Sequence, residues 1–147
     1  MTGLIFSAPN HSSPVIWGLE PFFVADALTG VISQRLVRRL CPECKKKYSS
    51  SPEETKLLKL KKERLIYKPI GCPACHNTGY KGRIGVHEVL NITDDIKELI
   101  LNKAPSSKIK EVAIKNGMNT LFETTRVAVL NGETSIDELL ALVLGND

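Results

Sequence analysis

The sequence has few aromatic residues and no long apolar stretch, and each absence excludes a class of protein. Aromatic residues make up 5% of the chain. Only three of them, Tyr48, Tyr67 and Tyr80, lie in the basic region of residues 35 to 83. Three aromatic residues are too few for the stacking surface that binds single-stranded nucleic acid. No uninterrupted apolar run approaches about 18 residues, so the sequence predicts no membrane-spanning helix. The first residues, Met1 to Leu4, lack a basic stretch followed by an apolar core, and we therefore expect no export signal.

The chain also lacks the phosphate loop GxxxxGK[ST]. It therefore offers no loop of backbone N–H groups to cradle phosphates, no phosphate-binding lysine and no following Ser or Thr to hold Mg²⁺. As it stands, the chain is expected to have no catalytic residues and no nucleotide-hydrolysing activity.

Cysteine is confined to two clips of equal spacing, Cys41-Pro-Glu-Cys44 and Cys72-Pro-Ala-Cys75. A two-residue spacer lets both thiolates of a clip reach one ion at about 2.3 Å, so the two clips predict one tetrahedral Zn²⁺ site. The 27 residues between the clips exceed the usual number of roughly 15 to 20, but the longer loop costs only about 0.4 kcal/mol in closure entropy. Four cysteine ligands close the coordination sphere, which favours a structural ion over a catalytic one.

Two other roles for these cysteines are less consistent with the sequence. A thioredoxin-like redox centre uses a single clip between a strand and a helix, whereas here the clip is doubled and each first cysteine is followed by proline. Structural disulfides need an oxidising compartment, and the absence of an export signal argues against one. Metal binding in a reducing cytoplasm is the interpretation that remains.

Charge is divided along the chain. Residues 35 to 83 contain 14 Lys and Arg against 4 Glu, whereas the flanking segments are acidic and bring the net charge of the chain to +4. The cysteine clips therefore lie in a strongly basic segment. Such a segment attracts nucleic acid, anionic lipid or an acidic protein surface, or is only a solvated face, and charge alone does not choose among these.

Turn and capping residues divide the rest of the chain into short elements. A helix is expected from Pro21 to about Thr29, with Phe22 and Phe23 in the core, and a short helix at Ser51-Pro52 within an otherwise polar, lysine-rich linker. Strands are expected at 3–7, 31–40 and 83–92. Helix starts are marked by Thr93, Pro105, Thr120 and Ser135, the last two as capping boxes with Glu123 and Glu138.

The order of these elements predicts an α+β fold. A hairpin of residues 31–40 and 83–92 carries the metal module inserted at its tip, and a bundle of short helices follows. Arg35, Arg38 and Arg39 of the first strand are candidates for a salt bridge with the acidic helical region.

Several motifs resemble the C-terminal part of the type II secretion and type IV pilus assembly ATPases, the secretion protein E family. The resemblance covers residues 18 to 144. Its motifs, in chain order, are GLEPF (18–22), GVISQRLVRRLCPEC (30–44), GCPAC (71–75), TGYKGRIGVHEVL (78–90), GMNTL (117–121), GETS (132–135) and DEL (137–139).

The resemblance implies a hexameric, cytoplasmic, membrane-associated motor whose RecA-like domain hydrolyses ATP to assemble pilins or pseudopilins. It divides the chain into a remnant of the RecA-like domain (1–40), a four-cysteine zinc-binding module (41–82) and a returning strand with C-terminal helices (83–147). For the arginines of residues 31–40 the resemblance implies, as the alternative to a salt bridge, a place near a subunit boundary. The acidic Walker B strand of the family is missing here, as is the phosphate loop. His11 stands near the place of the family's loop histidine, but several residues around it are deleted.

The sequence therefore predicts a truncated, zinc-binding and subunit-contact part of such an ATPase. Its expected metal ligands are Cys41, Cys44, Cys72 and Cys75. Its expected partners are the subunits of the hexamer and the inner-membrane platform, so it is expected in the cytoplasm or peripherally at the inner membrane. The alternative function is a zinc-ribbon module that binds nucleic acid through the basic segment.

Overall fold

The computed structural model describes residues 20–145. The predicted strand at 3–7 and His11 lie outside the described residues. Within 20–145 the fold is α+β, as predicted, with two separate two-stranded sheets and six short α-helices. In chain order the elements are α1 (Pro21–Ala27), β1 (Gly30–Leu40), β2 (Lys46–Ser49), α2 (Pro52–Leu57), β3 (Leu65–Lys68), the 3-10 helix η1 (Pro73–Cys75), β4 (Tyr80–Asn91), α3 (Asp94–Leu101), α4 (Ser106–Lys115), α5 (Leu121–Leu130) and α6 (Ile136–Leu144).

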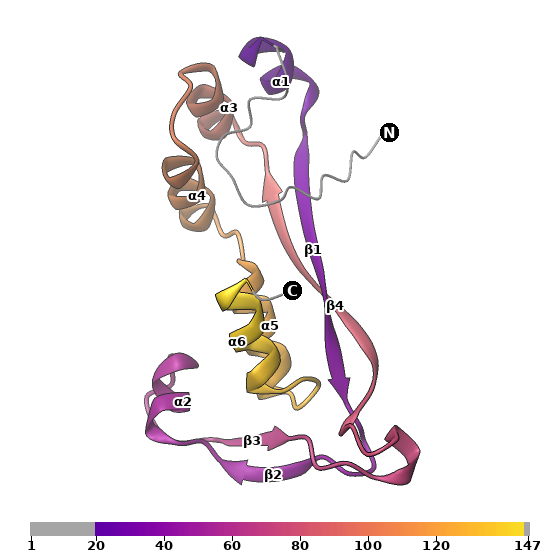
Figure 1. Cartoon of the computed structure of the whole chain (residues 1–147). Helices are drawn as coiled ribbons and strands as arrows, with labels where there is room; N and C mark the ends of the chain where they lie inside the picture. Colours follow the sequence, from indigo (N-terminus) through magenta and orange to yellow (C-terminus); the bar gives the residue numbers. More distant parts are fainter. Residues whose placement is uncertain (1–19, 146–147) are drawn as a thin grey trace. The chain divides into compact units, whose positions relative to one another are not determined.

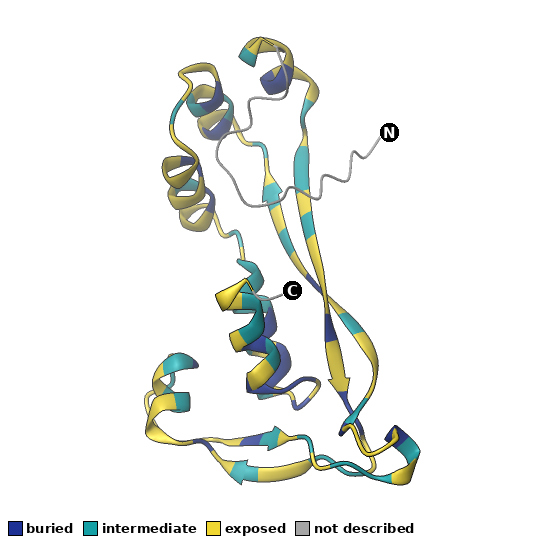
Figure 2. Cartoon of the chain, viewed as in Figure 1, coloured by how far each residue is buried: buried dark blue, intermediate teal, exposed yellow. Residues whose placement is uncertain are grey.

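The predicted long hairpin is present as strands β1 and β4, which pair in one sheet and run in opposite directions (Figure 1). Burial along β4 alternates as expected for a strand with one covered face, because Ile84, Val86 and Leu90 are less exposed than their neighbours (Figure 2). The segment that carries the cysteines lies between these strands in the sequence. Each of the two compact units of the chain contains part of both strands.

The first unit takes in the described residues up to Gln34 together with His87–Thr120. Helix α1 packs on α3, and α3 packs on α4. Thr93 is at the predicted N-cap position of α3, but its side chain makes no capping bond and instead accepts a hydrogen bond from Asn116 Nδ2 at 3.4 Å. The buried apolar residues of this unit are Val24, Ala25, Ile96, Ile100, Ile109 and Ala113.

The prediction that Phe22 and Phe23 lie in the core is wrong. Phe22 and Phe23 are 63% and 62% exposed, and their rings contact each other edge to face. Helix α1 is only seven residues long and buries Val24 and Ala25. A single short helix presents one narrow face to its neighbour, so the two rings at its start remain outside the core.

The second unit consists of Arg35–Val86 and Leu121–Asp147, of which residues up to 145 are described. Its antiparallel ribbon of β2 and β3 was not predicted, because the sequence of this segment is typical of a polar linker. In the ribbon Tyr48 lies opposite Ile66 and Lys46 lies opposite Lys68. The buried apolar residues join the segment between the clips to the last two helices, and they are Leu58, Ile66, Val129, Ile136 and Leu139.

The predicted helix start at Ser51 is confirmed in detail. Ser51 Oγ accepts a hydrogen bond from the backbone N–H of Glu54 at 3.2 Å, and the Glu54 carboxylate accepts one from the backbone N–H of Ser51 at 2.7 Å. The capping box predicted for Ser135 and Glu138 at the start of α6 is only half formed. Ser135 Oγ accepts from the N–H of Glu138 at 3.4 Å, but the Glu138 carboxylate binds Arg38 instead.

Candidate metal centre

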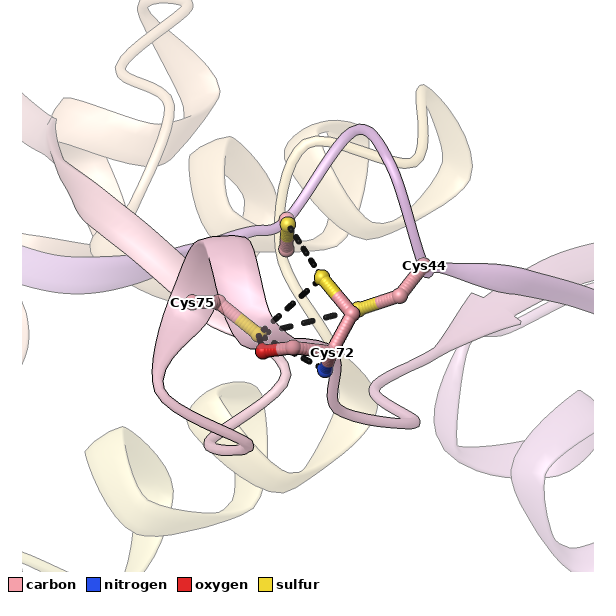
Figure 3. Close-up of side chains that lie close together, drawn as sticks. Cys44, Cys72 and Cys75 are labelled. Carbon is pink, nitrogen blue, oxygen red and sulfur yellow. Dashed lines mark hydrogen bonds between the residues drawn. The ribbon is translucent and has the colours of Figure 1, made fainter.

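The four cysteines come from two turns that follow different strands. Cys41 comes directly after β1, and Cys44 ends the tight turn that leads toward β2. Cys72 is the N-cap residue of η1, and Cys75 is the last residue of that 3-10 helix. Figure 3 shows the sulfur atoms of Cys44, Cys72 and Cys75 pointing toward one another.

The spacing of the sulfur atoms fits a tetrahedral metal site. All four Sγ atoms lie within 4.8 Å of one another, and among the residues described they form the cluster of side chains that could hold a metal ion. The sulfurs are 3.9 Å apart for Cys41 and Cys72, 3.8 Å for Cys44 and Cys75, and 3.7 Å for Cys72 and Cys75. Four ligands placed about 2.3 Å from one ion at tetrahedral corners are about 3.8 Å apart. A disulfide would need sulfurs at about 2.05 Å, and the four thiols are free.

Backbone N–H groups point at two of the sulfurs. Gly71 donates to Cys44 Sγ at 3.4 Å, and Cys75 Sγ accepts from the N–H groups of Cys72 and Gly79, each at 3.2 Å. These donors stabilise negative charge on sulfur. They therefore favour the thiolate, the form of cysteine that binds metal. The cysteines could be predicted from the sequence, whereas these backbone donors were not predicted. The glycines near each end of the second clip are the signal in the sequence that points to them.

The backbone can reach this geometry because glycine occupies the tightest positions. Gly71 and Gly79 have φ of +110° and +78°, a region that residues with a side chain rarely adopt. A Cβ atom at Gly71 would lie 2.7 Å from the carbonyl oxygen of Asn77, and one at Gly79 would overlap the ring of Pro69. His76 and Asn77 are themselves left-handed, and this tight turn returns the chain toward β4.

The thiols differ in how readily they ionise. Burial opposes ionisation of Cys75, but hydrogen bonds from the N–H groups of Cys72 and Gly79 and from the Cys72 and Cys44 thiols lower its pKa to about 6. Burial, followed by hydrogen bonds to the other three thiols, raises the pKa of Cys72 to about 12. Because a metal ion requires thiolates, filling such a site releases protons, and metal affinity falls as pH falls.

The lysines and tyrosines near the centre contact one another. Tyr67 has Lys45 and Lys47 over its ring, at 4.7 and 5.6 Å from the centroid, and Lys68 lies 5.5 Å from the centroid of Tyr48. Arg38 lies 4.1 Å from the centroid of Tyr80. All three tyrosines of the basic region thus have a cation over the ring. Those ring faces are not free to stack on nucleobases.

The sequence matches a known protein family over most of its length. Residues 16–141 match the family described as "Type II/IV secretion system protein". This chain belongs to that family. The match includes both cysteine clips, strands β1 and β4 and most of the helices that follow.

Relatives within the secretion system protein family carry names from both systems. The chain is 42% identical over 128 residues to the type IV pilus assembly ATPase PilB of Thermus thermophilus, an alignment that covers 84% of this chain and 14% of that protein. It is 38% identical over 150 residues to the type II secretion system ATPase E of Vibrio cholerae, covering 95% of this chain and 30% of the relative. The putative type II secretion system protein E of Escherichia coli is 33% identical over 125 residues, covering 84% of this chain and 25% of that protein. The chain thus spans less than a third of the length of these relatives.

No helix among residues 20–145 is both long enough and apolar enough to cross a membrane.

Proposed function

We propose that this chain is the C-terminal, zinc-binding and subunit-contact part of a type II secretion or type IV pilus assembly ATPase. The observation that carries the proposal is the tetrahedral spacing of four cysteine sulfurs within a chain that matches this family over residues 16–141. In this proposal Cys41, Cys44, Cys72 and Cys75 hold one structural Zn²⁺, and residues 41–82 form the metal module.

Zinc fits the donor set better than other ions. Four sulfur ligands in a tetrahedral arrangement suit Zn²⁺ or an iron–sulfur centre, whereas Mg²⁺ and Ca²⁺ take oxygen ligands. A single tetrahedral ion accounts for sulfur separations of 3.7 to 3.9 Å. With all four ligands supplied by protein, the ion has no open position for substrate, so its role is to hold the fold.

In this proposal the chain does not hydrolyse ATP by itself. The relatives named as ATPases are much longer, and the chain spans 14 to 30% of their length. The phosphate loop that would bind the nucleotide is missing from the sequence. The proposal therefore assigns no step of ATP hydrolysis to residues 1–147. It divides the chain at residues 40 and 82, which separates a RecA-like remnant from the metal module.

Subunit contact is supported by apolar residues on the surface of the second unit. Helix α6 buries Ile136 and Leu139, whereas Leu140, Val143 and Leu144 toward its C-terminal end are exposed. Val127 of α5 is also exposed. Exposed apolar side chains that gather on a surface are typical of an interaction site. We assign these residues to contacts with other subunits of the ATPase, placed in the cytoplasm or peripherally at the inner membrane.

A nucleic-acid-binding zinc ribbon is the rival function. Lys46 and Lys68 lie directly opposite each other in the β2–β3 ribbon, and like charges at such positions repel unless an anion lies between them. The cations over the tyrosine rings oppose this function, because they occupy the faces that bases would stack on. If phosphate contacts do form, affinity for duplex DNA falls with salt by a log–log slope of about −0.9 for each contact.

The test measures metal and turnover on the same purified chain. We expect one Zn²⁺ per chain by elemental mass spectrometry, no ATP turnover, and no retention on DNA or RNA at low salt. A Cys72→Ser chain should lose the metal, whereas Ser49→Ala, a change on the neighbouring ribbon away from the sulfurs, should keep it. A folded metal-free chain, or ATP turnover abolished by a point change within residues 20–145, would contradict the proposal.

A further inference from the structure

The backbone of the metal centre is hydrogen-bonded to the last part of β1. The N–H of Gly79 donates to Cys75 Sγ at 3.2 Å, and the carbonyl oxygen of Gly79 accepts from the N–H of Cys41 at 2.9 Å. One residue earlier, the N–H of Leu40 donates to the carbonyl oxygen of Glu133 at 2.9 Å. Leu40 and Cys41 therefore connect the cysteine turns to the loop that precedes α6.

Arg38 and α6 form a second connection. Glu138 Oε1 accepts a hydrogen bond from Arg38 Nε at 2.8 Å and forms an ion pair with Nη2 at 2.8 Å, while Oε2 accepts from the backbone N–H of Arg38 at 2.7 Å. Thr134 Oγ1 donates to the carbonyl oxygen of Arg38 at 2.8 Å. Both backbone groups of Arg38 and its side chain are thus used to hold the N-terminus of α6.

Tyr80 joins the two connections. It directly follows Gly79, its ring lies under the Arg38 guanidinium at 4.1 Å, and its hydroxyl shares a hydrogen bond of 2.8 Å with Ser135 Oγ. Ser135 is the N-cap residue of α6. Any movement of the turn that carries Cys75 and Gly79 therefore shifts the ring that supports Arg38 and the hydroxyl that holds the cap.

We infer that metal occupancy of the cysteine centre controls the docking of α6 on the second unit. The inference rests on the proposed function, since it requires that the four cysteines bind Zn²⁺. The coupling is carried by the hydrogen bonds of Tyr80 to Ser135, Ser135 to Glu138 and Arg38 to Glu138, together with the contact of the Arg38 guanidinium with the Tyr80 ring. Loss of the ion frees the Gly79–Tyr80 turn, loosens α6 and uncovers Ile136 and Leu139, which α6 contributes to the core.

Such coupling works in both directions. If the ion favours the docked state of α6, contacts that dock α6 must raise the affinity for the ion by the same factor. Coupling between sites is commonly worth a factor of about 5 to 150 in affinity. A merely local structural ion, with no link to α6, would show neither effect.

The test uses the full 147-residue chain with Zn²⁺ as the only added ligand. Hydrogen exchange of amides in α6 should be at least about tenfold faster in the chelated protein than in the Zn²⁺-loaded protein. In competition with a chromophoric chelator, Glu138→Gln should weaken Zn²⁺ binding by at least about fivefold. Tyr80→Phe, a milder change that keeps the ring and removes the hydroxyl, should act in the same direction.

Glu123→Gln is the matched control. Glu123 lies in the first turn of α5, as Glu138 does in α6, and it also binds two cations, Lys59 at 2.6 Å and Arg126 at 2.8 Å. Its ion pairs are not part of the path from the cysteines to α6, so we expect Zn²⁺ affinity within about twofold of the parent chain.

Equal exchange of α6 in the loaded and chelated proteins would overturn the inference and leave the zinc proposal standing. So would a loss of affinity in Glu123→Gln as large as that in Glu138→Gln. A chain that binds no Zn²⁺ at all would overturn the proposed function together with the inference.

Discussion

Gly79 shows how much of the metal centre depends on single residues. Its N–H donates to Cys75 Sγ, its carbonyl oxygen accepts from the N–H of Cys41, and its φ of +78° is one that a side chain disfavours. Gly82, three residues later, has nearly the same φ of +79° but nothing within 4 Å of the place where a Cβ atom would stand. The two glycines therefore separate the effect of backbone strain from the effect of crowding.

Changing each of these two glycines to alanine tests whether crowding of a Cβ atom, beyond backbone strain, makes glycine necessary at position 79. Both Gly79→Ala and Gly82→Ala carry a left-handed alanine at a cost of about 1 kcal/mol. Gly79→Ala also forces its Cβ into Pro69 and should lose roughly a further 1 to 3 kcal/mol in the free energy of unfolding. Urea denaturation of the Zn²⁺-loaded proteins measures both losses. Equal losses in the two variants would show that the contact with Pro69 does not matter.

At the scale of the element, helices α2 and α3 both have a hydroxyl residue at the N-cap, but only the one of α2 makes a capping hydrogen bond. Ser51 caps α2 through a complete box with Glu54, whereas Thr93 occupies the N-cap of α3 without a capping bond from its side chain. The same residue class at the same helix position thus contributes differently. The Thr93 hydroxyl instead accepts a hydrogen bond from Asn116, the residue that follows α4.

Alanine substitution at the two caps should give unequal losses. Ser51→Ala removes a bond to the N–H of Glu54 and should lower the free energy of unfolding by about 1 kcal/mol. Thr93→Ala removes only a long bond of 3.4 Å and should lower it by less than about 0.5 kcal/mol. Thermal unfolding by circular dichroism measures both. A larger loss for Thr93→Ala would contradict this account of the caps.

Ion pairs at the element scale also predict a pH dependence. Hydrogen bonds from Lys59 and Arg126 lower the pKa of Glu123 below its ordinary value. A carboxylate whose pKa is lower in the folded state stabilises the protein above its unfolded-state pKa, and this contribution is lost as pH falls through the folded-state value. We therefore expect the stability difference between the parent chain and Glu123→Gln, measured by urea denaturation, to be present at neutral pH and to disappear in acid. A difference that persists unchanged at about pH 3 would contradict it.

At the scale of the whole molecule, the two units have separate cores. The first is built on α1, α3 and α4, and the second joins the segment between the clips to α5 and α6. The cysteine centre lies wholly in the second unit. The proposed Zn²⁺ should therefore stabilise the core of the second unit and leave the core of the first largely unaffected.

Cys41→Ser tests this separation. Removing one ligand should release the ion and speed amide exchange first in the region from Cys41 to Tyr80, because structural zinc contributes on the order of 10 kcal/mol to folding. Exchange in α3 and α4 should change by less than about threefold. Exchange mass spectrometry of both chains measures the two regions at once. Unchanged protection between Cys41 and Tyr80, or equal loss in both units, would contradict the expectation.

Parts of the fold and of the site could be predicted because their signals are local. The two-residue spacing of each clip, the helix start at Ser51 and Pro52, and the alternation along β4 all involve residues close in sequence. The exposure of Phe22 and Phe23 and the pairing of β2 with β3 could not be predicted in this way. They depend on which surfaces α3, α5 and α6 present, and no short stretch of sequence contains that information.

The sequence by itself determined the cysteine clips, the family and the main elements, because covalent spacing and capping chemistry act over a few residues. Only the tertiary structure decided that Arg38 binds Glu138, 100 residues away, rather than leaving Glu138 to close its own capping box. The physical reason is competition for the Glu138 carboxylate. Arg38 donates two hydrogen bonds to it, from Nε and from the backbone N–H, and adds an ion pair through Nη2, whereas the N-cap backbone would donate one hydrogen bond.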